Sequence, residues 1–267
     1  MIKVGIIGSM GRMGQLLVQE VMATSDLMLS GGLEYKGHAA IGFDVGEKAG
    51  AAKAGLLITD DAASLIAASD VLVDFTLPEN SLHCLELARK ANKAYVMGTT
   101  GFSALQQQAI IAAATDIPLL LSANMSLGVN LLAELVRQAS AILDDAYDIE
   151  IVEMHHKHKV DAPSGTALLL GNSAAEGRKI ALVEHQVLSR QGHSGARKVG
   201  DIGFATLRGG DVAGDHTVIF AGEGERLELT HKAGNRRLFA KGAITAARWL
   251  ASKKAGQYSM KDVLFGA

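Results

Sequence analysis

Short segments with the pattern of buried strands alternate with segments of helical periodicity through the first part of the chain. Residues 2–7 and 71–75 are apolar runs typical of buried strands, and apolar positions three and four apart follow at 12–23. Such alternation builds βαβ units, in which parallel strands form one sheet covered by helices. The sequence therefore predicts an α/β fold built on a parallel sheet.

The pattern changes after Asn124. A long amphipathic helix is expected next, and residues 187–232 have the pattern of strands and turns. The segment 238–251 is helical again and can pack back on the first domain. These changes predict a discontinuous first domain and a smaller α+β domain. The expected bounds are 1–125 with 236–267 for the first domain, and 126–235 for the second.

Charge and cysteine content exclude several classes of partner. The formal net charge is −2, which gives no basic field for nucleic acid or membrane surfaces. The single cysteine, Cys84, excludes an internal disulfide framework and fits a reducing compartment. We find no signal-peptide pattern at the start and no apolar run of the ~18 residues that a membrane helix needs. We therefore expect a cytoplasmic protein that binds neither nucleic acid nor membranes.

A glycine-rich turn separates the first predicted strand from the first helix. Its spacing is G-x-x-G-x-x-G over residues 8–14, where a backbone without side chains can approach a pyrophosphate at a helix N-terminus. The commoner spacing is G-x-G-x-x-G, and a simple strand-to-helix turn is the alternative. Glu34 ends the second strand, where an acid can bind the adenosine ribose, and Arg12 can contact phosphates. Together these features favour a Rossmann-like, dinucleotide-binding domain.

Two further loops of the first domain follow predicted strands. They are residues 98–100 and 122–125, and ligands bind at the carboxyl edge of a parallel sheet. Both loops could line the cofactor, and an ordinary connecting loop is the alternative for each.

The stretch EMHHKHKVDAPSGTA, residues 153–167, is the most unusual part of the sequence. Residues 155–159 hold three histidines and two lysines. A metal site is disfavoured, because adjacent histidines on a strand point apart and the lysines would repel a cation. Nucleic acid is disfavoured by the shortness of the run and the absence of interleaved aromatic residues. A solvated charged surface remains an alternative.

An anion site explains this stretch best. Ammonium and imidazolium groups attract carboxylates, and the backbone N–H groups of Ser164, Gly165 and Thr166 are expected to open a helix. Two anion-binding features within ten residues predict a ligand with more than one carboxylate.

The string HHKHKVDAPSGTA closely resembles the signature of the 4-hydroxy-tetrahydrodipicolinate reductase (dihydrodipicolinate reductase) family of bacterial lysine and diaminopimelate biosynthesis. The resemblance covers nearly the whole chain, including VGIIGSMGRMG, VDFTLPE, GTTGF, SANMSLGVN, GFATLRGGDVAGDHTV and GERLELTHKA. It implies an NADH- or NADPH-dependent oxidoreductase acting on a small dicarboxylate. It also implies a Rossmann domain completed by the C-terminal tail, and an α+β domain for substrate binding and assembly of a homotetramer.

The resemblance also implies a role for individual residues. His155 corresponds to the catalytic histidine and Lys159 to the proton-donating lysine, and no metal is implied. The implied substrate contacts are His156, Ser164, Gly165 and Thr166. The implied cofactor contacts are Gly8, Ser9, Met10, Gly11, Arg12, Met13, Glu34, Tyr35, Gly98, Thr99, Thr100, Ser122, Ala123, Asn124 and Met125.

One departure from the family pattern concerns the cofactor. The enterobacterial pattern has an arginine after the ribose-binding acid, whereas this chain has Tyr35 and then Lys36. An arginine can grip the 2′-phosphate of NADPH with two hydrogen bonds, which tyrosine cannot do. We therefore expect NADH to be used at least as well as NADPH. Two rival functions are a related dehydrogenase of another small amino acid, such as aspartate, and a non-catalytic dinucleotide-binding module.

Overall fold

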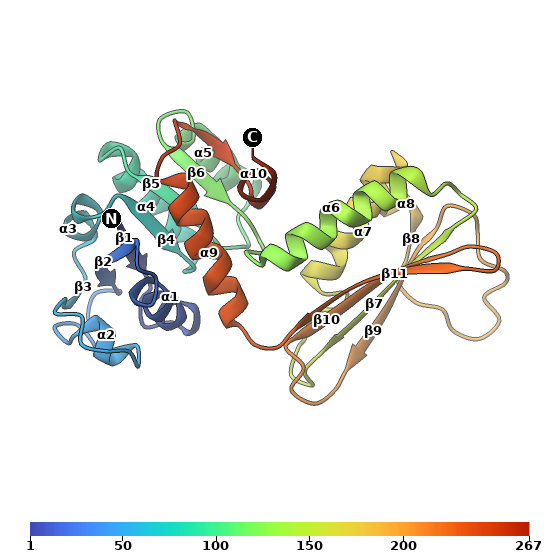
Figure 1. The fold of residues 1–267 in the computed structure, drawn as a ribbon, viewed down its shortest axis with the longest axis horizontal. Coiled ribbons are helices and arrows are strands. Elements are labelled where there is room, and N and C mark those ends of the chain that lie inside the picture. The colour runs from blue at the N-terminus through green and yellow to red at the C-terminus, as the bar shows by residue number, and fades with distance from the viewer. Residues whose placement is uncertain (267) are drawn as a thin grey trace. The chain divides into compact units, whose positions relative to one another are not determined.

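The fold is described from a computed structural model, which describes residues 1–266 (Figure 1). The chain forms two compact units. The first comprises Met1–Leu127 together with the chain from Arg237 onwards, and the second comprises Gly128–Arg236. These junctions lie within two residues of the expected ones at 125/126 and 235/236.

The first unit is built on a seven-stranded sheet in the order β12-β6-β5-β4-β1-β2-β3, and all its paired strands are parallel. The strands β4 and β5 are buried along their whole length, because βαβ connections cover both faces of such a sheet with helices. The predicted α/β class with a Rossmann-like sheet is confirmed. The strands are β1 (Ile2–Ile7), β2 (Leu27–Leu33), β3 (Ile58–Thr59), β4 (Val71–Asp74), β5 (Ala94–Met97), β6 (Pro118–Leu121) and β12 (Gly256–Tyr258).

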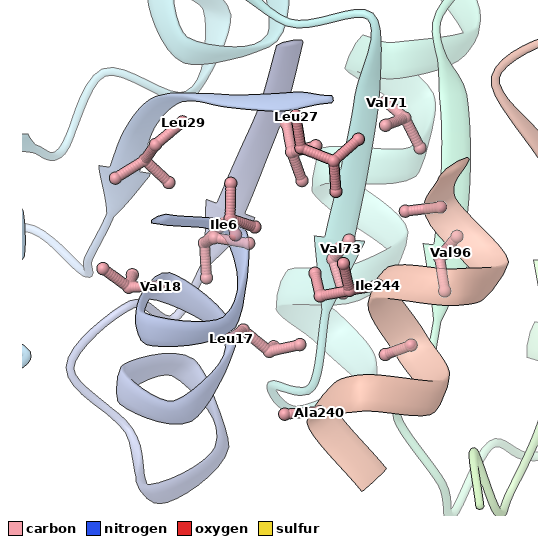
Figure 2. Close-up of a cluster of buried hydrophobic side chains, with 14 of the residues drawn as sticks. Ile6, Leu17, Val18, Leu27, Leu29, Val71, Val73, Val96, Ala240 and Ile244 are labelled. Carbon is pink, nitrogen blue, oxygen red and sulfur yellow. The ribbon is translucent and has the colours of Figure 1, made fainter. Parts of the chain in front are cut away.

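Helices pack on both faces of this sheet. On one face, α1 and the C-terminal α9 meet the strands through residues such as Leu17 and Ile244 (Figure 2). On the other face, α3, α4 and α5 enclose a second cluster that includes Leu72, Leu85 and Ile110. The helices of this unit are α1 (Arg12–Met22), α2 (Val45–Lys48), α3 (Ala62–Ala68), α4 (Pro78–Lys90), α5 (Ala104–Ala113), α9 (Arg237–Leu250) and α10 (Met260–Phe265).

The second unit is a mixed sheet in the order β11-β10-β7-β9-β8. The central β7 runs antiparallel to β10 and parallel to β9. Burial alternates along β7, because one face packs under α6 and α7 around Val136, Ile151 and Leu170. The elements are α6 (Leu127–Ile142), β7 (Asp148–His155), α7 (Gly165–Arg178), α8 (Leu182–His185), β8 (Gln186–Val187), β9 (Ile202–Arg208), β10 (Gly214–Ala221) and β11 (Arg226–Ala233).

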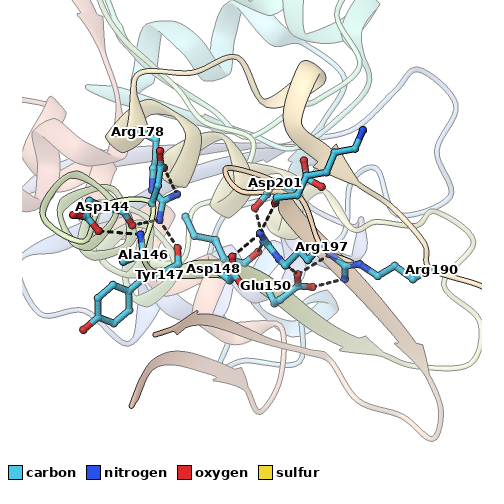
Figure 3. Close-up of polar contacts among 12 residues, drawn as sticks. Asp144, Ala146, Tyr147, Asp148, Glu150, Arg178, Arg190, Arg197 and Asp201 are labelled. Carbon is cyan, nitrogen blue, oxygen red and sulfur yellow. Dashed lines mark hydrogen bonds and ion pairs between the residues drawn. The ribbon is translucent and has the colours of Figure 1, made fainter. Parts of the chain in front are cut away.

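Arginines fix the connections of the second unit (Figure 3). Arg190 and Arg197 both bind the carboxylate of Glu150, at 2.8 and 3.0 Å, and so hold the segment 188–201 against β7. Arg178, at the end of α7, donates to the carbonyl oxygens of Asp144 and Tyr147 at 2.9 and 2.5 Å. These contacts order the loops at the end of the sheet that lies away from His155.

The packing of α9 yields a stability prediction. A Cβ atom on Gly242 would overlap the carbonyl oxygen of Met125, whereas one on Gly234 would meet open space. We expect Gly242→Ala to lower the free energy of unfolding by about 1–3 kcal/mol through overpacking, with a matching fall in Tm. Gly234→Ala is the matched control. Equal Tm values for the two variants in thermal denaturation would contradict this packing.

Candidate active site

The glycine turn of the first unit is tightly folded. Gly8 has a φ of +70°, and the N–H groups of Gly8 and Ser9 donate to the carbonyl oxygen of Leu33 at 2.9 and 3.1 Å. A Cβ on Gly14 would overlap the Gly8 carbonyl oxygen, so α1 packs against the turn as closely as a glycine allows. The turn thus has the close strand–helix packing of a pyrophosphate-binding loop.

Glu34 lies beside this turn and accepts a hydrogen bond from the N–H of Met10 at 2.7 Å. The turn and Glu34 border a cavity of about 300 Å³ at the carboxyl ends of β1, β2 and β4. Tyr35 also lines it, and its side chain is 70% exposed. The cavity is lined by Ile7, Gly8, Gly11, Leu33, Glu34, Tyr35, Phe75, Thr76, Leu77 and Asn80. Its position and its acidic residue fit the adenosine half of a dinucleotide.

The segment from Phe75 to Asn80 forms part of this cavity although the sequence did not single it out as a cofactor contact. The available signal was its place after β4, at the same edge of the sheet as the glycine turn. A buried network holds the segment. Asp74 accepts from the N–H of Thr76 at 2.8 Å and from the hydroxyl of Tyr95 at 2.7 Å.

The two other predicted cofactor loops are held by internal hydrogen bonds but do not line this cavity. Thr99 is buried and accepts a hydrogen bond from the Ser81 hydroxyl at 2.8 Å. The Ser122 hydroxyl donates to the Asn124 carbonyl oxygen at 2.8 Å. The side chain of Met125 belongs to the core, and the residue as a whole is 1% exposed. The sequence also predicted cofactor contacts at Gly98, Thr100 and Ala123 of these loops and at Arg12 and Met13 of the turn. These contacts stay predictions.

In the second unit, β7 brings Glu153 and His155 to the same buried face. They are 1% and 8% exposed, because residues two apart on a strand share a face. His156 and the exposed Lys157 follow where the strand ends. The run of basic residues therefore divides into a buried histidine and a more exposed loop.

Five hydrogen bonds reach the Glu153 carboxylate. Arg208 binds both oxygens, at 2.9 and 3.0 Å, and Nδ1 of His155 lies 2.5 Å from Oε2. The Ser164 N–H and the Thr206 hydroxyl donate to Oε1 at 3.1 and 3.3 Å. Burial disfavours the charged form of Glu153, but the bonds from Arg208, His155 and Ser164 outweigh it, and the pKa of Glu153 lies below its ordinary value.

A second histidine, His216, completes the cluster. Its Nε2 lies 3.0 Å from the Ser164 hydroxyl, and its ring meets that of His155 edge-on at 5.0 Å. Burial, followed by the charge of His155, lowers the pKa of His216 to about 4. His216 is therefore neutral near pH 7.

The basic loop after His155 is tied to the same cluster. Lys159 forms an ion pair with Asp161 at 2.8 Å, and Arg208 donates to the carbonyl oxygen of Asp161 at 2.6 Å. Burial, followed by the positive charge of Arg236, lowers the pKa of His156. The loop thus holds Lys159, paired with Asp161, on the same network as the buried pair.

The start of α7 differs from the expectation in one detail. Ser164 is buried and acts as N-cap, accepting from the N–H of Ala167 at 3.1 Å. Because its own N–H donates to Glu153, a ligand at this helix start would meet Gly165 and Thr166 rather than Ser164. Gly165 has open space where a side chain would lie.

Glu153, His155 and His216 have donor atoms within 4.8 Å of one another, which is close enough to consider a metal ion. The carboxylate, however, is already bound by the guanidinium of Arg208 and faces Nδ1 of His155. A cation at this position would have to displace a permanently charged arginine. The geometry favours a hydrogen-bonded cluster of charges.

Sequence reasoning missed Glu153, Arg208, His216 and Arg236 as parts of this site. Glu153 could have been predicted from the sequence, since it stands two positions before His155 and so lies on the same face of the strand. Strand pairing sets His216 opposite Glu153 and Arg208 opposite His155, whereas Arg236 lies just before α9 and acts on His156 through its charge. No local pattern in the sequence marks that register.

Within residues 1–266 no helix is both long and apolar enough to cross a membrane. The fold and the two sites define a class: a two-unit oxidoreductase with a Rossmann unit for a dinucleotide and a second unit that carries acid–base groups.

Comparisons with known proteins identify the family. The model of the dihydrodipicolinate reductase N-terminus matches residues 2–125, and that of the C-terminus matches residues 128–264. The chain therefore belongs to the dihydrodipicolinate reductase family. The family resemblance inferred from the sequence is confirmed, and with it the prediction that the chain is a reductase.

Individual relatives agree over nearly the full length. The 4-hydroxy-tetrahydrodipicolinate reductase of Parvibaculum lavamentivorans is 53% identical, with 98% of this chain and 97% of the relative covered. That of Beijerinckia indica is 52% identical over the same shares. A dipicolinate-bound dihydrodipicolinate reductase from Paenisporosarcina sp. TG-14 has a TM-score of 0.78 at 27% identity, with 97% of each chain covered.

The glycine turn yields a binding prediction. Gly14→Ala should weaken dinucleotide binding about tenfold or more, ~1.4 kcal/mol, because a Cβ there pushes α1 away from the turn. Gly11→Ala should have a smaller effect, since its Cβ would lie 3.3 Å from the Gly8 carbonyl oxygen. Calorimetry on folded variants measures both. Unchanged affinity in Gly14→Ala would refute the role of the turn.

Proposed function

We propose that the chain catalyses the NAD(P)H-dependent reduction of 4-hydroxy-tetrahydrodipicolinate, by way of dihydrodipicolinate, to tetrahydrodipicolinate in lysine and diaminopimelate biosynthesis. The observation that carries the proposal is the match of both family models along the chain, with the His155–Glu153 pair at the centre of the second unit.

The second unit is proposed to bind the dicarboxylate substrate. Lys159 offers a positive group, His156 offers a hydrogen-bonding imidazole, and the start of α7 at Gly165 and Thr166 offers backbone donors. The dipicolinate of the Paenisporosarcina relative is a planar dicarboxylate of the same kind. Ser164 contributes indirectly, by holding the helix start against Glu153.

The reaction begins with a cyclic hydroxy-imine. Loss of water leaves a conjugated imine. A reduced nicotinamide, when bound, supplies a hydride for the far end of that conjugated system, and the enamine so formed takes a proton on the adjacent carbon. His155 and Lys159 are proposed to hold the transferable protons, and their positive charge stabilises negative charge that develops on the substrate.

The first unit is proposed to hold the cofactor through the glycine turn and Glu34, with NADH used at least as well as NADPH. Glu34 can accept hydrogen bonds from a ribose 2′-hydroxyl, whereas a 2′-phosphate would meet its negative charge. Tyr35 lines the same cavity and carries no compensating charge.

We also propose a cytoplasmic homotetramer that assembles through the second unit. The face of its sheet that points away from α6 and α7 carries apolar side chains, including Val152, Met154 and the 50% exposed Leu207. An apolar sheet face of this kind is suited to pairing with another copy of the chain.

The experiment that tests the proposed function is a reductase assay. The substrate is generated enzymatically from pyruvate and aspartate semialdehyde, and the loss of NADH or NADPH absorbance is followed. We expect oxidation of the cofactor that depends on this substrate. Dehydrogenation of aspartate with NAD⁺ and no turnover of the cyclic imine would favour the rival dehydrogenase, and no turnover of either would favour a binding module.

The acid–base groups yield a kinetic prediction. His155→Ala and Lys159→Ala should each lower kcat by about 10²–10⁴-fold, because positioned proton transfer contributes that much. NADH affinity should stay unchanged, since neither residue lies in the first unit. Lys157→Ala removes an exposed lysine of the same run and is the matched control. Normal turnover in both variants, or activity lost to a chelator and restored by zinc, would contradict these roles.

The cofactor cavity yields a specificity prediction. A 2′-phosphate beside Glu34 should cost on the order of 1 kcal/mol. Tyr35→Arg should offset that cost and shift the ratio of kcat/KM towards NADPH by about a factor of ten. The comparison is run at low ionic strength, where single charge contacts are strongest. A wild-type preference for NADPH of about tenfold would overturn the expectation and would point to Lys36 and Arg12 as a phosphate clamp.

A further inference from the structure

Glu153 has no assigned role in the reaction, yet it is hydrogen-bonded to His155, the proposed acid. Its carboxylate is almost completely buried and is held by residues from three different segments. They are Arg208 and Thr206 of β9, Ser164 at the start of α7, and His155 of its own strand.

We propose that Glu153 is a positioning residue that fixes a single tautomer of His155 and couples this histidine to the substrate-binding start of α7. The inference rests on the proposed function, in which His155 is an acid. Glu153 itself acts through His155 and is not assigned a contact with the substrate.

The tautomer follows from the count of donors around the carboxylate. Arg208 and the Ser164 N–H can only donate, so they require an ionised, accepting Glu153. A carboxylate 2.5 Å from Nδ1 of His155 requires a proton on that nitrogen. Nε2 is therefore the atom that accepts or releases a proton during the reaction.

The surroundings of Nε2 agree with this assignment. A Cβ on Gly214 would come within 2.9 Å of Nε2, and Gly214 has a φ of +155°, in a region that favours glycine. A glycine at this position on β10 keeps the space beside Nε2 open.

The charges near His155 have complementary signs. Arg208 balances Glu153, so a protonated His155 leaves the cluster with one net positive charge, which suits an anionic substrate. His216 adds no charge near pH 7, because its pKa is about 4. The titratable and charged groups around His155 are Glu153, His156, His158, Lys159, Arg208, His216, His231 and, beyond Lys159, Asp161.

The other oxygen of Glu153 supplies the coupling. Oε1 accepts from the Ser164 N–H, and Arg208 reaches from the carboxylate to the carbonyl oxygen of Asp161. The loop that carries Lys159 thus begins at His155 and ends at Ser164, and both ends are fixed on the same carboxylate. The Glu153 carboxylate therefore sets the position of His155 relative to the start of α7.

The test is Glu153→Gln, which keeps the shape of the side chain but removes its charge. We expect kcat to fall by about 10²-fold, since the tautomer and the position of the acid are no longer fixed. The ¹⁵N signals of neutral His155 should then show a mixture of the Nδ1–H and Nε2–H tautomers, because the carboxylate no longer holds the proton on Nδ1. The Kd of NADH should not change.

Glu150→Gln is the matched control, since it also removes a carboxylate of β7 that is held by arginines, here Arg190 and Arg197. It should leave the His155 tautomer unchanged even if it lowers Tm. A Glu153→Gln enzyme with the wild-type kcat and a single His155 tautomer, or a Glu150→Gln enzyme with the same mixture of tautomers, would overturn the inference.

The wild-type protein provides a measurement that does not depend on a folded variant. ¹⁵N NMR of histidine-labelled protein should show the proton of neutral His155 on Nδ1 and the lone pair on Nε2. A dominant Nε2–H tautomer would overturn the inference while leaving the proposed function intact. A wild-type enzyme that does not reduce the cyclic imine would instead refute the proposed function, whatever the tautomer.

Discussion

The ion pair between Glu153 and Arg208 is the interaction on which the second unit's site depends. Burying a lone carboxylate costs several kcal/mol, so this one is stable only because donors surround both oxygens. Loss of one partner of such a buried pair typically costs about 3–5 kcal/mol, which makes its geometry hard to deform. The pair therefore also fixes His155 and the start of α7, because both are hydrogen-bonded to the same carboxylate.

The first unit reaches its function by a different physical route. Its proposed dinucleotide site depends on the absence of a side chain at Gly14, where α1 approaches the turn, and at Gly8, where a Cβ would meet Thr76. It depends also on one acid, Glu34, at the end of β2. A cofactor bound there would gain most of its affinity from backbone donors and a helix N-terminus. Cofactor binding and proton transfer are thus assigned to separate units with separate hydrogen-bond networks, which allows variants to affect one and spare the other.

The sequence predicted what is encoded locally. The glycine turn, Glu34 and the helix cap at Ser164 are adjacent in sequence to the elements they shape, and strand–helix alternation was enough for the parallel sheet. The Glu153 cluster was not predictable in this way. Arg208 and His216 reach it through the pairing of β9 and β10 with β7, which is set by tertiary packing. Ser164, whose N–H was expected to face a ligand, donates it to Glu153 across a loop that local sequence patterns do not place.

We expect the cluster organised by Glu153 to bind dicarboxylates, and NMR titration with dipicolinate measures this binding. Amide signals of ¹⁵N-labelled protein are followed as dipicolinate is added, with picolinate, its monocarboxylate analogue, as the matched ligand. We expect saturable shifts at Gly165, Thr166 and Lys159 with dipicolinate, and much weaker binding of picolinate. Shifts confined to other parts of the chain, or equal affinity for the two ligands, would contradict it.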